Sequence, residues 1–140
     1  MSVNGWESME QFIADNKILF SISFGPVLIE DGVLQECDWY PAGEVNTGYS
    51  RAGIGQYDKL HYYYMSLNHS PEQAARWTVN RFAKEMYNKG LPSAYCLDGG
   101  QTSEIVFQGE PYNHIDHGQE RVVSDIIYFA TAIPEAEVKP

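Results

Sequence analysis

The sequence has few basic residues and little cysteine. Its 140 residues include 9 lysines and arginines against 19 aspartates and glutamates, a formal net charge of −10. Because an acidic chain repels a phosphate backbone, nucleic acid is a poor candidate partner. Two cysteines cannot form a disulfide framework, and we expect Cys37 and Cys96 to be unpaired thiols. No apolar run reaches the roughly 18 residues of a membrane-spanning helix, and the first residues lack the pattern of a signal peptide.

The remaining composition is typical of a folded domain. Hydrophobic residues make up 44% of the chain and charged residues 20%, which argues against disorder and coiled coil. The length suits one domain, which we expect over residues 1–133, followed by a tail at 134–140. Aromatic residues make up 14%, a supply of flat rings that suits sugar faces as well as protein cores.

Hydrophobic periodicity predicts an α+β fold with a mostly antiparallel sheet, one long helix and a short N-terminal helix. The short helix is expected to end near Asn16, and a hairpin is expected around Asp31-Gly32. Further strands are expected at 51–56, 59–67, 94–97, 104–108 and 122–130.

The clearest local signal is Ser70-Pro71-Glu72-Gln73, which combines an N-cap serine, a proline at the first helical position and a capping-box glutamine. It predicts the long helix from Pro71 to about Lys89, ended by Gly90. The apolar stripe of this helix should pack on the sheet; it consists of Ala75, Val79, Phe82 and Met86.

A polar segment, Asp98 to Ser103, follows directly on a buried strand. Its successive glycines allow backbone N–H groups to converge on an anion, and Thr102 and Ser103 add hydroxyl donors. Asp98 is suited to act as an acid or base. The alternative is an ordinary tight turn in which Asp98 bonds its own backbone.

Other candidate groups are more isolated. Arg51 begins a glycine-bearing strand, and its guanidinium suits a phosphate or carboxylate, although a strand-end ion pair is the alternative. The cluster His114-Ile115-Asp116-His117 lies in an expected loop with no matching ligands, so we interpret it as a solvated polar loop and expect no metal site. No base stands at a recognisable spacing from Cys96 or Ser103, which leaves a nucleophilic role for either unsupported.

Four segments occur in an order and spacing that resemble the phosphodiester glycosidase family, which includes N-acetylglucosamine-1-phosphodiester α-N-acetylglucosaminidases. They lie at 24–32, 51–56, 97–103 and 120–125, and the resemblance covers roughly residues 18–131. The family patterns read approximately Gly-Pro-Val-Leu-Val-x-x-Gly, Arg-Thr-Ala-Ile-Gly and Asn-Leu-Asp-Gly-Gly-Gly-Ser-Ser. This chain differs at Gly53, Cys96, Gln101 and Thr102, and it has Met65 to His69 where the family has Asp-Gly-Arg.

The resemblance implies a hydrolase that cleaves a sugar-1-phosphodiester of an exopolysaccharide or cell-envelope glycan, in a bacterium or phage and outside the cytoplasm, without a cofactor. Arg51 is implied to hold the anion, Asp98 to act as acid or base, and Glu104 to be its partner carboxylate. Residues implied to bind substrate are Gly55, Gly99, Gly100, Gln101, Thr102 and Ser103.

The alternative function is a glycan-binding or assembly module that has lost turnover. The replacement of Asp-Gly-Arg favours it, and its sugar platform is expected at Trp39, Tyr40 and Tyr49. The family's domain begins well before the Gly-Pro segment, with motifs that residues 1–16 do not contain. We therefore expect either the C-terminal part of a longer protein or a shortened relative, whose exposed sheet edge could pair with another copy.

Overall fold

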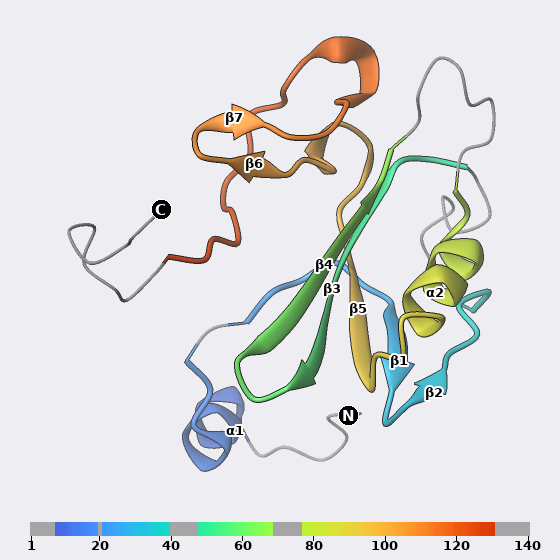
Figure 1. Cartoon of the computed structure of the whole chain (residues 1–140). Helices are drawn as coiled ribbons and strands as arrows, with labels where there is room; N and C mark the ends of the chain where they lie inside the picture. The colour runs from blue at the N-terminus through green and yellow to red at the C-terminus, as the bar shows by residue number, and fades with distance from the viewer. Residues whose placement is uncertain (1–7, 20, 40–47, 69–76, 131–140) are drawn as a thin grey trace, which may run out of the picture.

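A computed structural model describes residues 8–19, 21–39, 48–68 and 77–130. Its centre is a five-stranded sheet with the strand order β2-β1-β5-β3-β4, in which every neighbouring pair is antiparallel (Figure 1). The strands are β1 (Val27–Glu30), β2 (Val33–Leu34), β3 (Arg51–Asp58), β4 (His61–Leu67) and β5 (Ser93–Leu97). The other elements are the helices α1 (Met9–Asn16) and α2 (Val79–Tyr87), the hairpin strands β6 (Val106–Phe107) and β7 (Glu110–Pro111), and the 3₁₀ turns η1 (Gly100–Thr102) and η2 (Asp116–Gly118). The predicted α+β class and the mostly antiparallel sheet are confirmed.

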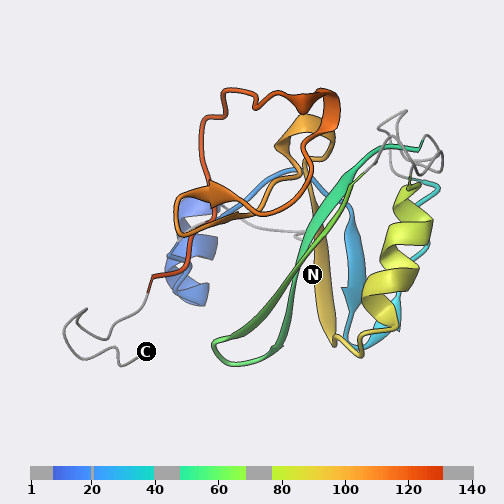
Figure 2. The same ribbon diagram turned by 45° about the horizontal axis from the view of Figure 1, so that its top comes forward.

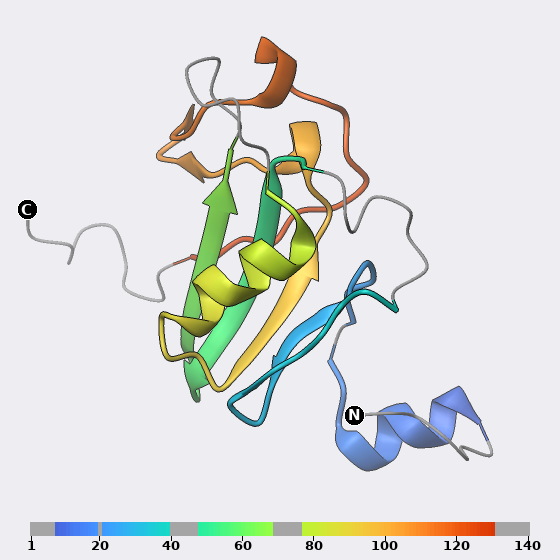
Figure 3. The same ribbon diagram turned by 90° about the vertical axis from the view of Figure 1, so that its right-hand side faces the viewer.

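Helix α2 lies across one face of the sheet and forms the core with it (Figure 3). Its buried residues include the predicted Val79, Phe82 and Met86, whereas the predicted Ala75 lies outside the described residues. Gly53 explains how closely the helix approaches β3: a Cβ at this position would lie 2.8 Å from Phe82 Cε1. The β6–β7 hairpin lies on the opposite side of the sheet from α2 (Figure 2).

The long helix expected from Pro71 is shorter in the structure. Thr78 has an extended backbone, and its hydroxyl accepts the N–H of Arg81, which makes Thr78 the N-cap of α2. Trp77 forms an isolated β-bridge with Tyr49, so one continuous helix cannot run through this point. The expected cap at Ser70-Pro71 lies outside the described residues. The predicted stop is confirmed, since Gly90 takes a left-handed φ of 77° just after the helix.

The N-terminal helix is confirmed, but it contributes no side chain to the core. Ser8 caps α1 by accepting the N–H of Gln11, and the helix ends at Asn16 as expected. None of its residues is buried; Met9 and Ile13, on its apolar side, are exposed.

The expected final strand at 122–130 is wrong. Residues 121–130 contain neither helix nor strand, and Val122 and Ile126 are 96% and 75% exposed. An apolar, β-prone sequence forms a strand only where a sheet edge pairs with it, and no described strand pairs with this one. The strand expected at 104–108 is reduced to the two residues of β6.

Four other expectations concern the membrane, the cysteines, the sheet edges and the tail. No helix in the described ranges is long and apolar enough to cross a membrane. Cys37 and Cys96 are buried free thiols, as expected. Strands β2 and β4 form the edges of the sheet, and pairing of such an edge with another copy stays a prediction. The expected tail at 134–140 lies outside the part of the chain that the structure describes.

Candidate functional site

Strand register brings the two main candidate residues to the same edge of the sheet. In the antiparallel pairing of β3 with β5, Ala52 lies opposite Leu97. Arg51 precedes Ala52 and Asp98 follows Leu97, so these two residues are neighbours where β3 begins and β5 ends. Residues 47 positions apart in the sequence therefore meet because of backbone pairing alone.

The turn after β5 packs tightly on the start of β3. A side chain at Gly99 would collide with the carbonyl oxygen of Ser50, and the N–H of Gly100 donates to this same oxygen at 2.9 Å. The N–H of Gly99 donates to Asp98 Oδ1, also at 2.9 Å, as in the tight turn considered from the sequence. Both glycine amides are therefore engaged within the chain, and the expected role of these amides as anion donors finds no support in this geometry.

Arg51 and Asp98 line one open cavity of about 270 Å³ at this edge of the sheet. Arg51 is buried, with 4% of its surface exposed, and its Nε donates to the carbonyl oxygen of Trp77 at 2.9 Å. Its guanidinium carbon also lies 5.7 Å from the centre of the Tyr49 ring. The cavity is lined by Phe24, Tyr49, Arg51, Asp98, Gly99, Gly100, Gln101, Asp116, His117 and Arg121.

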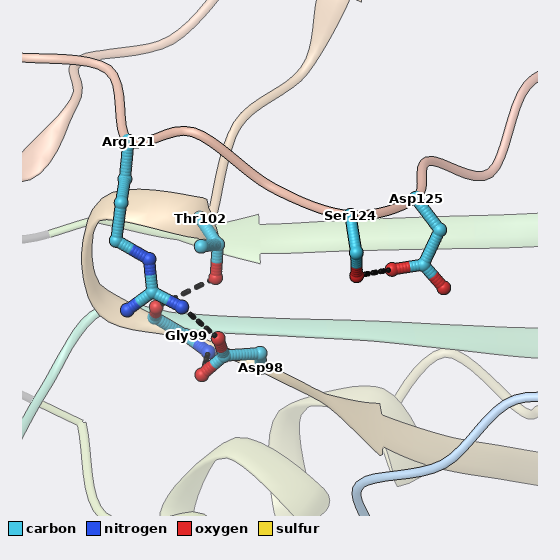
Figure 4. A network of polar contacts seen from close by, with 6 residues as sticks. All are labelled: Asp98, Gly99, Thr102, Arg121, Ser124 and Asp125. Atoms are coloured by element: carbon cyan, nitrogen blue, oxygen red, sulfur yellow. Dashed lines mark hydrogen bonds and ion pairs between the residues drawn. The ribbon is translucent and has the colours of Figure 1, made fainter.

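A second guanidinium, that of Arg121, reaches the cavity from the C-terminal segment. Its Nη2 forms an ion pair with Asp98 Oδ2 at 3.1 Å, and both side chains are about half exposed (Figure 4). Close by, Gln101 Nε2 donates to the carbonyl oxygen of Gln119. Sequence reasoning did not assign Arg121 a role, although it lies in the fourth of the family-like segments.

A second carboxylate, Asp116, also lines the cavity. It is 4% exposed, and Oδ1 accepts a hydrogen bond of 2.6 Å from the Ser50 hydroxyl. The expectation of a solvated polar loop is therefore wrong at Asp116, because η2 turns this side chain inward against the start of β3. His114 and His117 are exposed, which agrees with a solvated loop at these two residues. Among the described residues, no group of three or more metal-ligating side chains occurs.

Four of the sequence-predicted site residues lie outside the cavity lining. Gly55 lies in the middle of β3, where a Cβ would meet Leu91. The Thr102 hydroxyl donates to the carbonyl oxygen of Gly99, and the buried Ser103 hydroxyl donates to that of Arg51. These contacts hold the turn against the sheet. The fourth residue is Glu104.

Glu104 lies away from the cavity, in an environment that disfavours its charged form. Burial is the main cause that raises its pKa, and the negative charge of Glu120 adds to the effect. Its Oε1 is buried, without a hydrogen-bond partner among the described residues. Asp116, rather than Glu104, therefore shares the cavity with Asp98.

The thiol of Cys96 is not activated. Burial is the main cause that raises its pKa from 9.0 to about 12. The nearby Arg51 guanidinium lowers the pKa, but by less than burial raises it. A thiol with this pKa is un-ionised at neutral pH, and the thiolate is the reactive form. No base stands at a recognisable spacing from Cys96 in the sequence, and its burial is a second reason against a nucleophilic role.

Comparisons with known proteins identify a similar fold and a family. A crystal structure of a hypothetical protein from Synechocystis is similar to the chain, with a TM-score of 0.63 and 21% sequence identity over 78% of this chain. The match covers 21% of that protein's length, so the chain corresponds to about a fifth of it. No curated protein matches the sequence. Residues 4–130 match the phosphodiester glycosidase family, and because this match covers most of the sequence, the chain belongs to that family.

Proposed function

We propose that the chain is a hydrolase that cleaves a sugar-1-phosphodiester in the cavity at the edge of the sheet. The observation that carries this proposal is the meeting of Arg51 and Asp98 around one cavity in a member of the phosphodiester glycosidase family. A guanidinium offers a phosphodiester anion two parallel hydrogen bonds, and a carboxylate offers water a base.

In the proposed reaction, water attacks the anomeric carbon of the sugar. The bond between that carbon and the bridging oxygen breaks, and its electron pair stays with the phosphate, which leaves as a phosphomonoester. Asp98 accepts the proton of the attacking water. Its ion pair with Arg121 supports this role, because the contact holds the Asp98 carboxylate in place at the cavity.

Arg51 is proposed to neutralise the diester and the charge that develops on the leaving phosphate. Its burial and its hydrogen bond to the Trp77 carbonyl support this role, because a fixed cation in a partly enclosed site needs little reorganisation during the reaction. Gln101, which also lines the cavity, is proposed to bind sugar hydroxyls or phosphate oxygens.

Asp116 is proposed as the second carboxylate of the reaction in place of Glu104. It lines the cavity with Asp98, and its Oδ1 is fixed by the Ser50 hydroxyl. Paired carboxylates at a glycosidic bond divide the work of orienting water and stabilising the positive charge that develops on the sugar ring. The substrate class that the family suggests is a glycan of an exopolysaccharide or cell envelope.

A glycan-binding module without turnover is a second candidate. The observation that favours it is the side chain of Trp39, an aromatic ring of the kind that stacks on sugars, which is 73% exposed. Trp39 does not line the cavity, whereas Tyr49 does, and Tyr40 lies outside the described residues. A platform at Trp39 would therefore bind sugar apart from Arg51 and Asp98.

Release of free sugar from an N-acetylglucosamine-1-phosphodiester tests the two candidates. We expect Asp98→Asn to lower kcat about 10²- to 10⁴-fold, the usual effect of losing a general base, and Asp116→Asn to lower it as well. Asp125→Asn is the matched control, because this exposed carboxylate bonds Ser124 outside the cavity lining and should keep full activity. Sugar binding that requires Trp39 and is accompanied by no turnover would contradict the hydrolase and favour the binding module.

A further inference from the structure

The cavity contains two guanidinia in different environments. Arg51 is buried and bonded to backbone, whereas Arg121 is about half exposed and bonded to the side chain of Asp98. Of these two arginines, Arg121 therefore has the contact that a ligand can replace without disturbing the core.

The segment that contains Arg121 forms neither helix nor strand over residues 121–130. Gln101 bonds the carbonyl oxygen of Gln119 on one side of it, and further along the chain the Phe129 ring lies 5.5 Å from that of Tyr62. Between these points the apolar side chains of Val122 and Ile126 are exposed. The Asp98 carboxylate is thus a main contact that positions the Arg121 guanidinium over the cavity (Figure 4).

An anion in the cavity would compete with Asp98 for this guanidinium. A phosphodiester offers Arg121 the same geometry as a carboxylate, two oxygens in one plane with the guanidinium. An ion pair between two half-exposed side chains stabilises the folded chain only weakly, because solvent screens it, so a ligand that also contacts Arg51 can replace it.

We propose that Arg121 is a second anion-binding residue of the cavity, and that a phosphodiester takes it from Asp98 by exchange. In the free protein Asp98 holds Arg121 over the cavity. When the ligand binds, the guanidinium turns to the phosphate, and the Asp98 Oδ2 atom becomes available to water. The inference rests on the site of the proposed function but not on its turnover.

The test is equilibrium binding of dimethyl phosphate, a monoanionic diester, followed by NMR chemical-shift titration. Trimethyl phosphate, which is neutral, serves as the uncharged probe. We expect dimethyl phosphate to bind and trimethyl phosphate not to bind. Arg121→Gln should weaken dimethyl phosphate binding about 3- to 10-fold, since it removes one charge-assisted contact.

Asp98→Asn should strengthen the binding of dimethyl phosphate about 2- to 5-fold, because it removes the competing carboxylate. The double variant separates exchange from the general effect of removing a negative charge near the anion. In the Arg121→Gln background, Asp98→Asn should strengthen the binding of dimethyl phosphate much less. Arg81→Gln is the control for net charge, since Arg81 lies 3.9 Å over the Trp77 ring and not at the cavity, and it should bind like the wild type.

Two results would overturn the exchange. One is equal affinity of the wild type and Arg121→Gln for dimethyl phosphate, and the other is the same gain from Asp98→Asn with and without Arg121. Binding is measured without a sugar, so it is independent of hydrolysis. If the exchange is observed but no sugar is released, the proposed function alone is wrong. If Arg121→Gln still releases sugar with an unchanged KM, the exchange alone is wrong.

Discussion

Adding a methyl group at Gly53 tests the packing of α2 against β3, on which the shape of the fold depends. A Cβ at this position would lie 2.8 Å from Phe82 Cε1 and 2.9 Å from Met86 Sδ, both closer than carbon and sulfur atoms pack. Phe82 and Met86 are fully buried, so neither can move out into water. Gly53→Ala should therefore overpack the core and lower the free energy of unfolding by about 1–3 kcal/mol.

Removing the Phe82 ring tests whether the clash with this ring causes the loss of stability. Phe82→Ala alone should cost about 3–5 kcal/mol, the usual loss for a buried phenylalanine. Once the ring is removed, the extra methyl group meets no clash with it, so the double variant should be less destabilised than the two single variants together by about 1 kcal/mol or more. Gly55→Ala is the matched control: its Cβ meets Leu91 and the Ser93 backbone instead, and it should gain no such relief from Phe82→Ala.

Urea unfolding followed by circular dichroism measures these free energies. Phe82→Leu, a milder change, replaces Phe82→Ala if the latter does not fold. The reasoning fails if Gly53→Ala leaves the stability unchanged, or if its effect adds to that of Phe82→Ala within about 0.5 kcal/mol.

Two further predictions concern buried titratable groups. Because burial raises the pKa of Cys96 from 9.0 to about 12, the folded chain keeps a proton that the unfolded chain loses, and the free energy of unfolding should fall by about 1.4 kcal/mol per pH unit above 9. Cys96→Ala should show a shallower fall in urea titrations from about pH 8 to about pH 10.5, and an equal slope would contradict the assignment. Burial and Glu120 raise the pKa of Glu104, so its charge opposes folding at neutral pH and Glu104→Gln should raise the unfolding midpoint there. This gain should vanish in acid below the ordinary pKa of glutamate, and the exposed Glu110→Gln should show none; a gain that persists in acid would refute the electrostatic cause.

The sheet could be predicted from the sequence because its strands are marked by local chemistry. The Asp31-Gly32 turn, the glycines of β3 and the buried run of β5 each indicate a strand or a turn without reference to the rest of the chain. The start of α2 depends on more than local capping signals. The pairing of Trp77 with Tyr49, a contact between distant residues, keeps the backbone out of the helix at Trp77, and α2 begins only after Thr78.

The segment at 122–130 shows the limit of propensity for strands. Val122, Ile126 and Phe129 suit a strand, but a strand exists only with a partner edge, and sequence does not show which edges are available. The prediction failed because it inferred pairing from composition.

Some residues of the candidate site could be predicted from the sequence, and others could not. Arg51 and Asp98 could be found because each lies at one end of an expected strand, in a glycine-bearing segment that resembles the phosphodiester glycosidase family. Asp116 and Arg121 come from a 3₁₀ turn and an irregular segment, which have no periodicity that would place them. Burial of Asp116 against Ser50 and pairing of Arg121 with Asp98 are tertiary contacts, visible only once the fold is known.

Hydrolysis of an N-acetylglucosamine-1-phosphodiester in ¹⁸O-labelled water tests the central claim most directly. The account predicts that water attacks the anomeric carbon, so mass spectrometry should find the label in the released sugar and none in the phosphomonoester. Asp98→Asn should slow the appearance of labelled sugar, and Asp125→Asn should not. Label in the phosphomonoester would mean that the phosphorus atom is attacked instead, and labelled sugar formed at the wild-type rate by Asp98→Asn would remove this carboxylate from the reaction.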